Sequence, residues 1–402
     1  MTGKFHTEWG DFHSLKNREA LEFECFQMLA VGASCSIGDQ LHPNGVLDAA
    51  SYRLIGDVYA QVEAKEPWVR GAQPVNEIGV MLPPSFGDEV TRPAVRQRDR
   101  VPRSSAGAFQ MLAADGYQFD YISPKSDFSR YKVILLTDDV PLNAESAAKL
   151  ESYVASGGKV IASFRGGLLR ETGDFPAFFG VHFEQESPFN PDFVLPDGFV
   201  AAGLPATEHV MYLRGAQVSA VNDARVIAQT MRPYFNRTHE HFMSHKHAPS
   251  NGETVYPAVI EHGGVVYFAH PIFSQYQHNA PRWTHTMLRN ALQHLIGLPL
   301  ITHNGPSTLQ VFVNEQADSR GTRWIVHLLH YIPIRRSDTI DVIEDVIPLY
   351  DLQLCLRLPH TVRSARLVPE GEAIQFDAGQ GAVVLRVDKL CGHAMIEVNL
   401  GS

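Results

Sequence analysis

The sequence predicts a multidomain α/β protein: the end of a (β/α)8 barrel, a flavodoxin-like doubly wound α/β domain and a C-terminal antiparallel β-sandwich. Three observations predict this arrangement. About the first seventy residues alternate strand, polar loop and helix twice. Short apolar strands then alternate with helices up to residue 300, and from residue 307 strand composition continues without helical periodicity. The predicted domains are 1–73, 74–300 and 301–402.

The N-terminal region reads as two βα units. A strand at Gly3–His6 precedes a helix at Arg18–Gly32, and a strand at Ala33–Ile37 precedes a helix at Ala49–Lys65. Two such units cannot close a sheet. We therefore expect them to be the last two units of a barrel whose other strands lie outside this chain. Acids and aromatics follow each strand, where (β/α)8 barrels keep their chemistry.

The middle region shows the pattern of a parallel sheet with helices between its strands. Gly157-Gly158 between a helix and a strand is a typical helix stop, and residues 176–225 look irregular. The expected strands are Glu77–Leu82, Phe119–Ile122, Lys132–Leu136, Lys159–Ser163, Ala258–Ile260 and Val265–Ala269, and the expected helices are Ala106–Asp115, Ala144–Ser156 and Trp283–Ile296.

The C-terminal region predicts a small antiparallel β-sandwich. Alternation places Trp324, Val326 and Leu328 on one face of a strand and Ile325 and His327 on the other. Both faces mix apolar and polar residues, so core packing is expected and no binding stripe stands out. The expected strands are Thr308–Val313, Arg323–Leu329, Leu352–Leu358, Ser364–Leu367 and Ala382–Val387.

Composition limits the function classes. The chain has 402 residues, 44% hydrophobic and 19% charged, with a net charge of −10. Nucleic acid is not expected as a partner because no basic stripe is available for phosphates. The basic run Arg92–Arg103 is predicted to be a solvated loop. No apolar run is long enough for a membrane span, so no membrane partner is expected. Four cysteines without CxxC spacing favour the cytoplasm.

Seven segments along the chain carry a resemblance to a known family: Phe5–Phe12 (FHTEWGDF), Gly32–Pro43 (GASCSIGDQLHP), Glu66–Trp68 (EPW), Gly116–Asp120 (GYQFD), Gly157–Val160 (GGKV), Arg237–His241 (RTHEH) and Phe268–Phe273 (FAHPIF). Together they resemble the family 42 β-galactosidases and a related group of glycoside hydrolases. The resemblance covers nearly the whole chain, and its motifs are moderately specific as a set.

The resemblance implies a β-galactosidase trimerisation domain in the middle, a homo-oligomer (a trimer) and a carbohydrate substrate. It also implies retaining hydrolysis of a glycosidic bond by two carboxyl groups, of which the acid/base would lie outside this chain. Glu8 follows the strand that corresponds to the seventh barrel strand, where the nucleophile is expected. The motif around Glu8 differs from the family pattern, so Asp11 is a competing candidate.

Four further residues are candidates for binding the sugar: Trp9, Phe12, Asp39 and His42. An aromatic ring suits the apolar face of a pyranose, although Trp9 and Phe12 would also suit a lid over the core. Asp39 follows the eighth barrel strand and is expected to hydrogen-bond a sugar hydroxyl.

Histidines gather at residues 239–247. His239 and His241 flank Glu240, and we expect them at a subunit interface, reaching a neighbour's sugar pocket. A transition-metal site and a solvated loop are the alternatives. The spacing does not form HExxH, so no metal is expected.

The middle domain also resembles the class I glutamine amidotransferase fold. Active members carry a cysteine after the strand that here ends at Ser163, and this sequence has Ser163-Phe164-Arg165 instead, outside a GxSxG setting. An inactive structural copy is the expected role, with a serine nucleophile as the alternative. No dinucleotide fingerprint follows the first strand, and no cofactor is expected.

The sequence therefore leaves two functions open. The first is the C-terminal portion of a β-galactosidase-like glycoside hydrolase, inactive alone because the general acid is missing. The second is a non-catalytic oligomerisation or binding module of a carbohydrate-active assembly.

Overall fold

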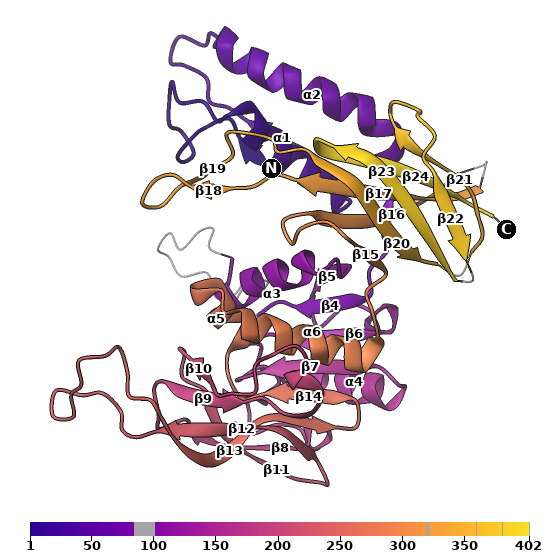
Figure 1. The fold of residues 1–402 in the computed structure, drawn as a ribbon. Coiled ribbons are helices and arrows are strands. Elements are labelled where there is room, and N and C mark those ends of the chain that lie inside the picture. Colours follow the sequence, from indigo (N-terminus) through magenta and orange to yellow (C-terminus); the bar gives the residue numbers. More distant parts are fainter. Residues whose placement is uncertain (84–100, 319–320, 359, 380, 402) are drawn as a thin grey trace. The chain divides into compact units, whose positions relative to one another are not determined.

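The computed structural model describes residues 1–83, 101–318, 321–358, 360–379 and 381–401. The chain forms two compact units (Figure 1). Unit 1 consists of Met1–Val75, Ala113–Gln118 and Leu300–Ser402, and unit 2 of Asn76–Leu112 and Phe119–Pro299. Most of the basic run Arg92–Arg103 lies outside the described residues.

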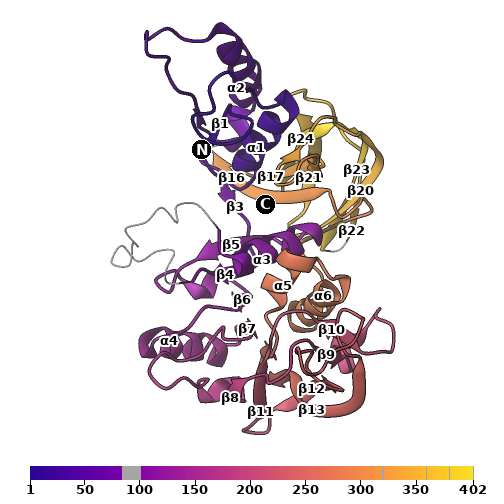
Figure 2. The ribbon, with the colours of Figure 1, turned by 90° about the vertical axis from the view of Figure 1, so that its left-hand side faces the viewer.

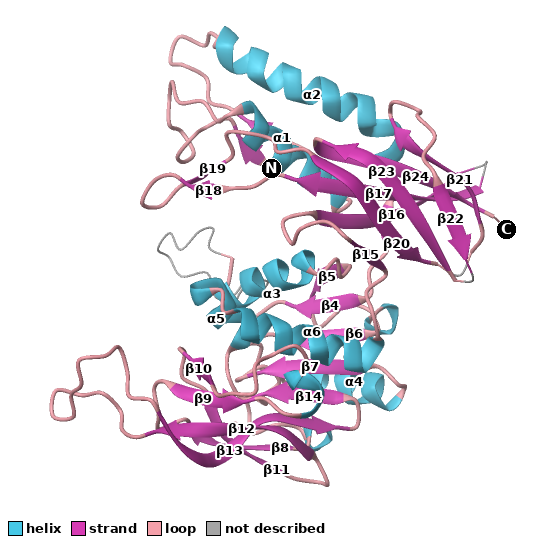
Figure 3. Ribbon diagram, in the orientation of Figure 1, coloured by secondary structure: helices cyan, strands magenta, loops and turns pink. Residues whose placement is uncertain are grey.

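Both units combine helices with sheets, so the prediction of a mixed, sheet-rich α/β protein is confirmed (Figure 3). None of the helices in the described part of the chain has the length and apolar composition that a bilayer-spanning helix needs.

Unit 1 begins with two parallel βα units. Strands β1 (Thr2–Gly3) and β2 (Ile37–Gly38) pair with each other and with no further described strand. Each leads through a loop into a helix, α1 (Arg18–Ala30) or α2 (Ala49–Val69). The helices begin where the sequence predicts. The predicted strand bounds are wrong, because a strand extends only as far as its pairing and this pairing covers two residues in each strand.

Two antiparallel sheets form the rest of unit 1. One has the order β15-β20-β23-β22 and the other β21-β24-β17-β16-β3, and their facing side chains make one apolar core. The strands are β3 (Gln73–Pro74), β15 (Ile301–His303), β16 (Gln310–Asp318), β17 (Gly321–His330), β18 (Ile334–Arg335), β19 (Asp341–Val342), β20 (Leu349–Arg357), β21 (Val362–Val368), β22 (Phe376–Gly379), β23 (Ala382–Leu390) and β24 (Gly392–Leu400), with β18 and β19 forming a separate hairpin.

Strand β17 is buried on both faces. Trp324, Val326 and Leu328 lie in the core between the sheets, whereas Ile325 packs with Trp68 and Val69 at the end of α2. Both faces of this strand carry apolar residues because the second sheet covers one face and helices cover the other.

A buried polar cluster lies beneath these helices. His327 Nδ1 and His393 Nε2 are 3.2 Å apart, and the ring of Phe26 in α1 stacks on His393. The ammonium group of Lys65 lies over the ring of Phe26, 4.4 Å from the ring centroid. Burial, together with the nearby Lys65, lowers the pKa of His327 to about 3 and holds the pKa of His393 well below its usual value.

Unit 2 is built on a nine-stranded sheet of order β10-β9-β12-β13-β14-β7-β6-β4-β5. Strands β5, β4, β6, β7 and β14 run parallel. The sheet strands are β4 (Ile78–Met81), β5 (Phe119–Ile122), β6 (Val133–Leu136), β7 (Lys159–Ser163), β9 (Asp192–Leu195), β10 (His209–Met211), β12 (Arg225–Pro233), β13 (Ser250–His262) and β14 (Val265–Phe268); β8 (Val181–Glu186) pairs with β11 (Ala216–Ala220).

Two predictions for this unit are wrong. The sheet is not wholly parallel, because β13 pairs antiparallel with β14 and three more antiparallel neighbours extend it. The segment 176–225 is not irregular, because it contains β8, β9, β10 and β11. These strands are short, and proline and glycine lie between them. They form because they pair with segments distant in the sequence.

The helices of unit 2 flank the parallel strands. Figure 2 shows α4 (Ala144–Ala155) on one side of β6 and β7, and α5 (Ile272–Asn279) and α6 (Arg282–Ile296) on the other. The remaining helix is α3 (Arg103–Ala114). Leu150 and Tyr153 of α4 join the apolar core with Leu136 and Val160 of the sheet.

The buried His327 and the half-buried His393 predict acid sensitivity of unit 1. Their pKa values are lower in the folded protein than the usual value near 6.5, so the unfolded chain binds more protons and stability falls as pH drops below about 6.5. We expect the His327→Gln variant to show a shallower loss of unfolding free energy between pH 6.5 and 4.5, by up to about 1.4 kcal/mol per pH unit.

Urea unfolding followed by tryptophan fluorescence at several pH values measures this slope. His278→Gln, a change at an exposed histidine, is the matched control and should keep the wild-type slope. An unchanged slope in His327→Gln would contradict the prediction.

Candidate functional site

Two loops of unit 1 hold most of the predicted site. The first, residues 4–17, follows β1 and leads into α1; the second, residues 39–48, follows β2 and leads into α2. Because β1 and β2 are parallel neighbours, their carboxyl ends lie at the same edge and the two loops come together.

Trp9 bridges the two loops through close packing on glycine. Its ring lies edge-to-face with Phe5, with the centroids 5.1 Å apart. The ring also covers Gly38, where an added Cβ would lie 2.1 Å from the indole. Glycine is therefore required at position 38 for this approach. Trp9 remains 53% exposed, which leaves one part of the indole open for a ligand.

A second aromatic contact joins the loops. The ring of His42 lies edge-to-face with Phe12 and with His13, at centroid distances of 5.4 and 5.0 Å. Phe12 is exposed. These two ring contacts hold the second loop against the first.

Asp39 forms the polar link between the loops. Its Oδ1 lies 3.8 Å from the Nζ of Lys4, and both side chains are nearly buried. The same oxygen accepts a hydrogen bond from the backbone N–H of Gln40 at 2.7 Å. A carboxylate with one oxygen engaged in this way keeps acceptor capacity on the other.

The two nucleophile candidates, Asp11 and Glu8, differ in whether their carboxylates accept hydrogen bonds. Asp11 Oδ2 accepts a hydrogen bond from Thr7 Oγ1 at 2.6 Å, and this bond, followed by one from Ser14, lowers the pKa of Asp11. Glu8 is exposed, and among the described residues its carboxylate has no hydrogen-bond partner. The first loop thus presents one engaged and one unengaged carboxylate.

The remaining predicted residues lie in unit 2. His239 and His241 are exposed on the long connection between β12 and β13. The backbone N–H of His241 donates to Thr238 Oγ1, and His239 Nε2 lies 3.7 Å from Glu240. Across the described residues, no three His, Cys, Asp or Glu side chains are arranged to hold a metal ion.

Ser163, which the sequence predicts as a possible nucleophile, is not exposed. Ser163 is fully buried, and its hydroxyl donates to Asp138 Oδ1 at 2.6 Å. The residue in the left-handed conformation that a nucleophile elbow requires is Phe164, with φ 51°. Burial raises the pKa of Asp138 to about 6, although hydrogen bonds from Ser163 and Ser274 act in the opposite direction.

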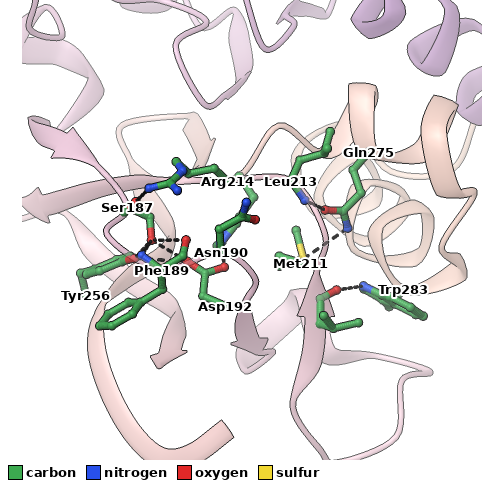
Figure 4. Close-up of polar contacts among 12 residues, drawn as sticks. Ser187, Phe189, Asn190, Asp192, Met211, Leu213, Arg214, Tyr256, Gln275 and Trp283 are labelled. Carbon is green, nitrogen blue, oxygen red and sulfur yellow. Dashed lines mark hydrogen bonds and ion pairs between the residues drawn. The ribbon is translucent and has the colours of Figure 1, made fainter. Parts of the chain in front are cut away.

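Unit 2 also contains a buried polar network that sequence reasoning missed (Figure 4). His270 Nε2 lies 2.7 Å from Asp192 Oδ1, and Asp192 Oδ2 accepts from Ser187 Oγ at 2.9 Å and from Tyr256 at 3.2 Å. Arg214 Nη1 donates to the Ser187 carbonyl at 2.7 Å.

This network is not a Ser-His-Asp triad, because the serine donates to the carboxylate and not to the histidine, whereas a triad places the imidazole between them. It fixes the segment between β8 and β9. Its members come from four distant segments without motif spacing. The one sequence signal was His270, which lies inside the segment Phe268–Phe273 used for the resemblance.

The chain is similar to glycoside hydrolases. Residues 91–177 match the family model described as the β-galactosidase trimerisation domain. The α-L-fucosidase isoenzyme 2 from Paenibacillus thiaminolyticus is 35% identical with a TM-score of 0.89, over 100% of this chain and 60% of that one. No curated relative matches the sequence significantly.

Two β-galactosidases share the fold at low identity. The enzyme from Bacillus circulans sp. alkalophilus is 14% identical with a TM-score of 0.63, over 99% of this chain and 55% of that one. The enzyme from Rahnella sp. R3 is 15% identical with a TM-score of 0.62, over 99% of this chain and 54% of that one. The chain thus spans between half and two thirds of the length of these proteins.

The contact between Trp9 and Gly38 is testable. In the Gly38→Ala variant the new methyl group occupies the position of the indole, so we expect Trp9 to turn out toward solvent. Because Trp9 is already partly exposed, the unfolding free energy should change by less than about 1 kcal/mol. Near-ultraviolet circular dichroism and the tryptophan emission maximum would report the movement.

Gly56→Ala is the matched control, since an added Cβ there meets no atom within 4 Å. Unchanged tryptophan spectra in Gly38→Ala would show that the ring does not pack on this glycine.

Proposed function

Because the chain is related to the glycoside hydrolases that carry a β-galactosidase trimerisation domain, we propose that it supplies the C-terminal part of a retaining glycosidase. In this proposal β1 and β2 are the last two strands of a (β/α)8 barrel. One observation carries it: β1 and β2 pair in parallel, each followed by loop and helix, and their loops bring together the acids and aromatics that a sugar-cleaving rim requires.

The surface of these units supports the barrel proposal. Exposed apolar side chains lie along the second loop and α2, among them Leu41, Val46 and Tyr59. A groove of about 860 Å³ is lined by α2 and by residues 29–35, at and after the end of α1. Exposed apolar side chains that lie close together are typical of an interface, and further barrel units would cover them.

The proposed mechanism assigns the attack to Glu8. Its carboxylate is unengaged and would attack the anomeric carbon to form a covalent glycosyl–enzyme intermediate. A second carboxyl group about 5–5.5 Å away would protonate the leaving oxygen and then activate water. Asp11 is the alternative nucleophile. Trp9 and Phe12 would stack on the sugar, and Asp39 and His42 would bind its hydroxyl groups.

We propose that the general acid/base belongs to a barrel segment outside this chain, so that the chain alone is inactive or nearly so. General acid–base catalysis contributes about 10²- to 10⁴-fold, and the missing barrel wall would also position the substrate. The identity of 35% over the whole chain favours an α-L-fucoside as the substrate, and the β-galactoside expected from the sequence is the competitor.

The parallel strands of unit 2 support a flavodoxin-like core with no catalytic role of its own. Numbered along the chain, their order is 2-1-3-4-5, as in flavodoxin-like sheets. The matched trimerisation model supports a homo-oligomer, proposed as a trimer, in which His239 and His241 reach a neighbour's sugar. The cysteine spacing supports a cytoplasmic location.

Activity of a chimera tests the catalytic proposal. The chimera joins the part of the Paenibacillus fucosidase that this chain does not cover to the chain itself, and aryl α-L-fucoside and β-galactoside serve as substrates. We expect hydrolysis by the chimera, and a loss of kcat of at least about 10³-fold in Glu8→Gln.

Asp11→Asn is the matched control and should keep most of the activity. Loss of activity in Asp11→Asn with full activity in Glu8→Gln would transfer the nucleophile to Asp11. An active chain without the added part would contradict the assignment of the acid/base to another segment.

Mass in solution tests the assembly proposal and its non-catalytic alternative. Light scattering after size exclusion should give a trimer of about three chain masses. In the active chimera, replacing both His239 and His241 by alanine should raise KM several-fold and leave kcat within about twofold. A strictly monomeric protein would count against assembly, and an assembled but inactive chimera would favour the binding-module function.

A further inference from the structure

A polar pocket lies on the five-stranded sheet of unit 1, separate from the loops that follow β1 and β2. It encloses about 320 Å³. Seven of its lining side chains are polar or charged: Thr322, Arg323, Arg363, Ser364, Arg366, Glu397 and Asn399.

The pocket is built on three adjacent strands. Asn399 of β24 stands opposite Arg323 of β17 on one side and Ser364 of β21 on the other. Glu397 of β24 stands opposite Arg366 of β21. Since all these positions belong to paired strands, the polar groups are held by the sheet backbone and not by a loop.

Glu397 is fully engaged within the protein. Its Oε1 accepts from Arg366 Nε at 2.8 Å and from Asn399 Nδ2 at 2.9 Å, and its Oε2 accepts from Arg323 Nη1 at 2.7 Å. Trp68 Nε1 also donates to Oε2, at 2.7 Å. Burial alone would raise the pKa of this carboxyl, but these hydrogen bonds lower it to about 2. The carboxylate is therefore a fixed negative charge.

Arg366 has donors to spare. Arg323 and Arg366 share the single carboxylate of Glu397, which leaves an excess of positive charge beside it in a chain whose net charge is −10. Arg366 uses Nε on Glu397, and among the described residues its two Nη groups have no hydrogen-bond partner. Ser364 accepts from Asn399 at 3.0 Å, so its own hydroxyl proton remains available.

The guanidinium donors and the positive charge of the pocket define which ligands would fit it. A guanidinium presents paired N–H donors in a plane and binds carboxylate, sulfate or phosphate oxygens in pairs. An excess of positive charge in a concave site attracts such anions. Solvated arginines scattered on a surface would not share a cavity or a common buried carboxylate.

We propose that this pocket binds a small oxyanion, a carboxylate, sulfate or phosphate group, either free or carried on a saccharide. The inference goes beyond the proposed glycosidase function and stands independently of it, because none of its residues belongs to the candidate catalytic loops.

Isothermal titration of the purified chain at low salt tests the proposal. The probes are inorganic phosphate, galacturonate, galactose 6-sulfate and, as the uncharged control, galactose. We expect at least one anion to bind with a Kd below about 1 mM, no binding of galactose, and weaker binding as sodium chloride is raised. Tighter binding of the acidic sugars than of phosphate identifies a saccharide ligand, and the reverse identifies the free anion.

Three variants locate the binding. Arg363→Gln and Arg366→Gln should each weaken anion binding about tenfold or more, and Arg366→Lys should weaken it although the charge is kept. Arg386→Gln is the matched control: Arg386 is 42% exposed against 45% for Arg366, and it pairs with Asp377 on the other sheet.

Circular dichroism checks that each variant is folded. If Arg366→Gln loses its fold through Glu397, Arg363→Gln still decides, because no hydrogen bond joins Arg363 to that carboxylate in the structure. Failure of every anion to bind below about 10 mM, or equal weakening in Arg386→Gln, would overturn the proposal.

Discussion

A single buried carboxylate joins the N-terminal helices to the β-sandwich. Glu397 accepts hydrogen bonds from strand residues and from Trp68 at the end of α2. A buried charge costs several kcal/mol unless it is paired, and removal of one partner typically costs about 3–5 kcal/mol. This hydrogen-bond network therefore fixes where α2 ends on the sheet, and it gives the adjacent arginines a constant charge environment.

The candidate site depends on this attachment. Helix α2 follows β2, and α1 packs over the same sheet through the stacking of Phe26 on His393. With both helices held, β1 and β2 pair and their loops meet, which places Trp9 on Gly38 and His42 beside Phe12. Side chains on loops are held in precise positions only where rigid helices and strands support those loops. In this chain those elements are the two helices and the five-stranded sheet.

Unit 2 is stabilised in a different way. Its parallel strands β4, β6 and β14 are apolar and fully buried, and polar groups near the strand ends are satisfied internally, as Ser163 is by Asp138 and His270 is by Asp192. The hydroxyl groups of Ser163 and Ser187 both donate to carboxylates. The chemistry that we propose for the protein lies in unit 1.

The sequence by itself determined the helices other than α5, and the residue types of the candidate rim. The predicted Arg18–Gly32 and Ala144–Ser156 are helices at Arg18–Ala30 and Ala144–Ala155, because helical hydrogen bonds are local and periodicity reports them. Only the tertiary structure decided the short β1 and β2, the antiparallel extension of the nine-stranded sheet and the oxyanion pocket around Glu397. Each of these depends on pairing or burial between segments distant in the chain, and a local pattern does not encode which distant partner will satisfy a strand edge or a charge.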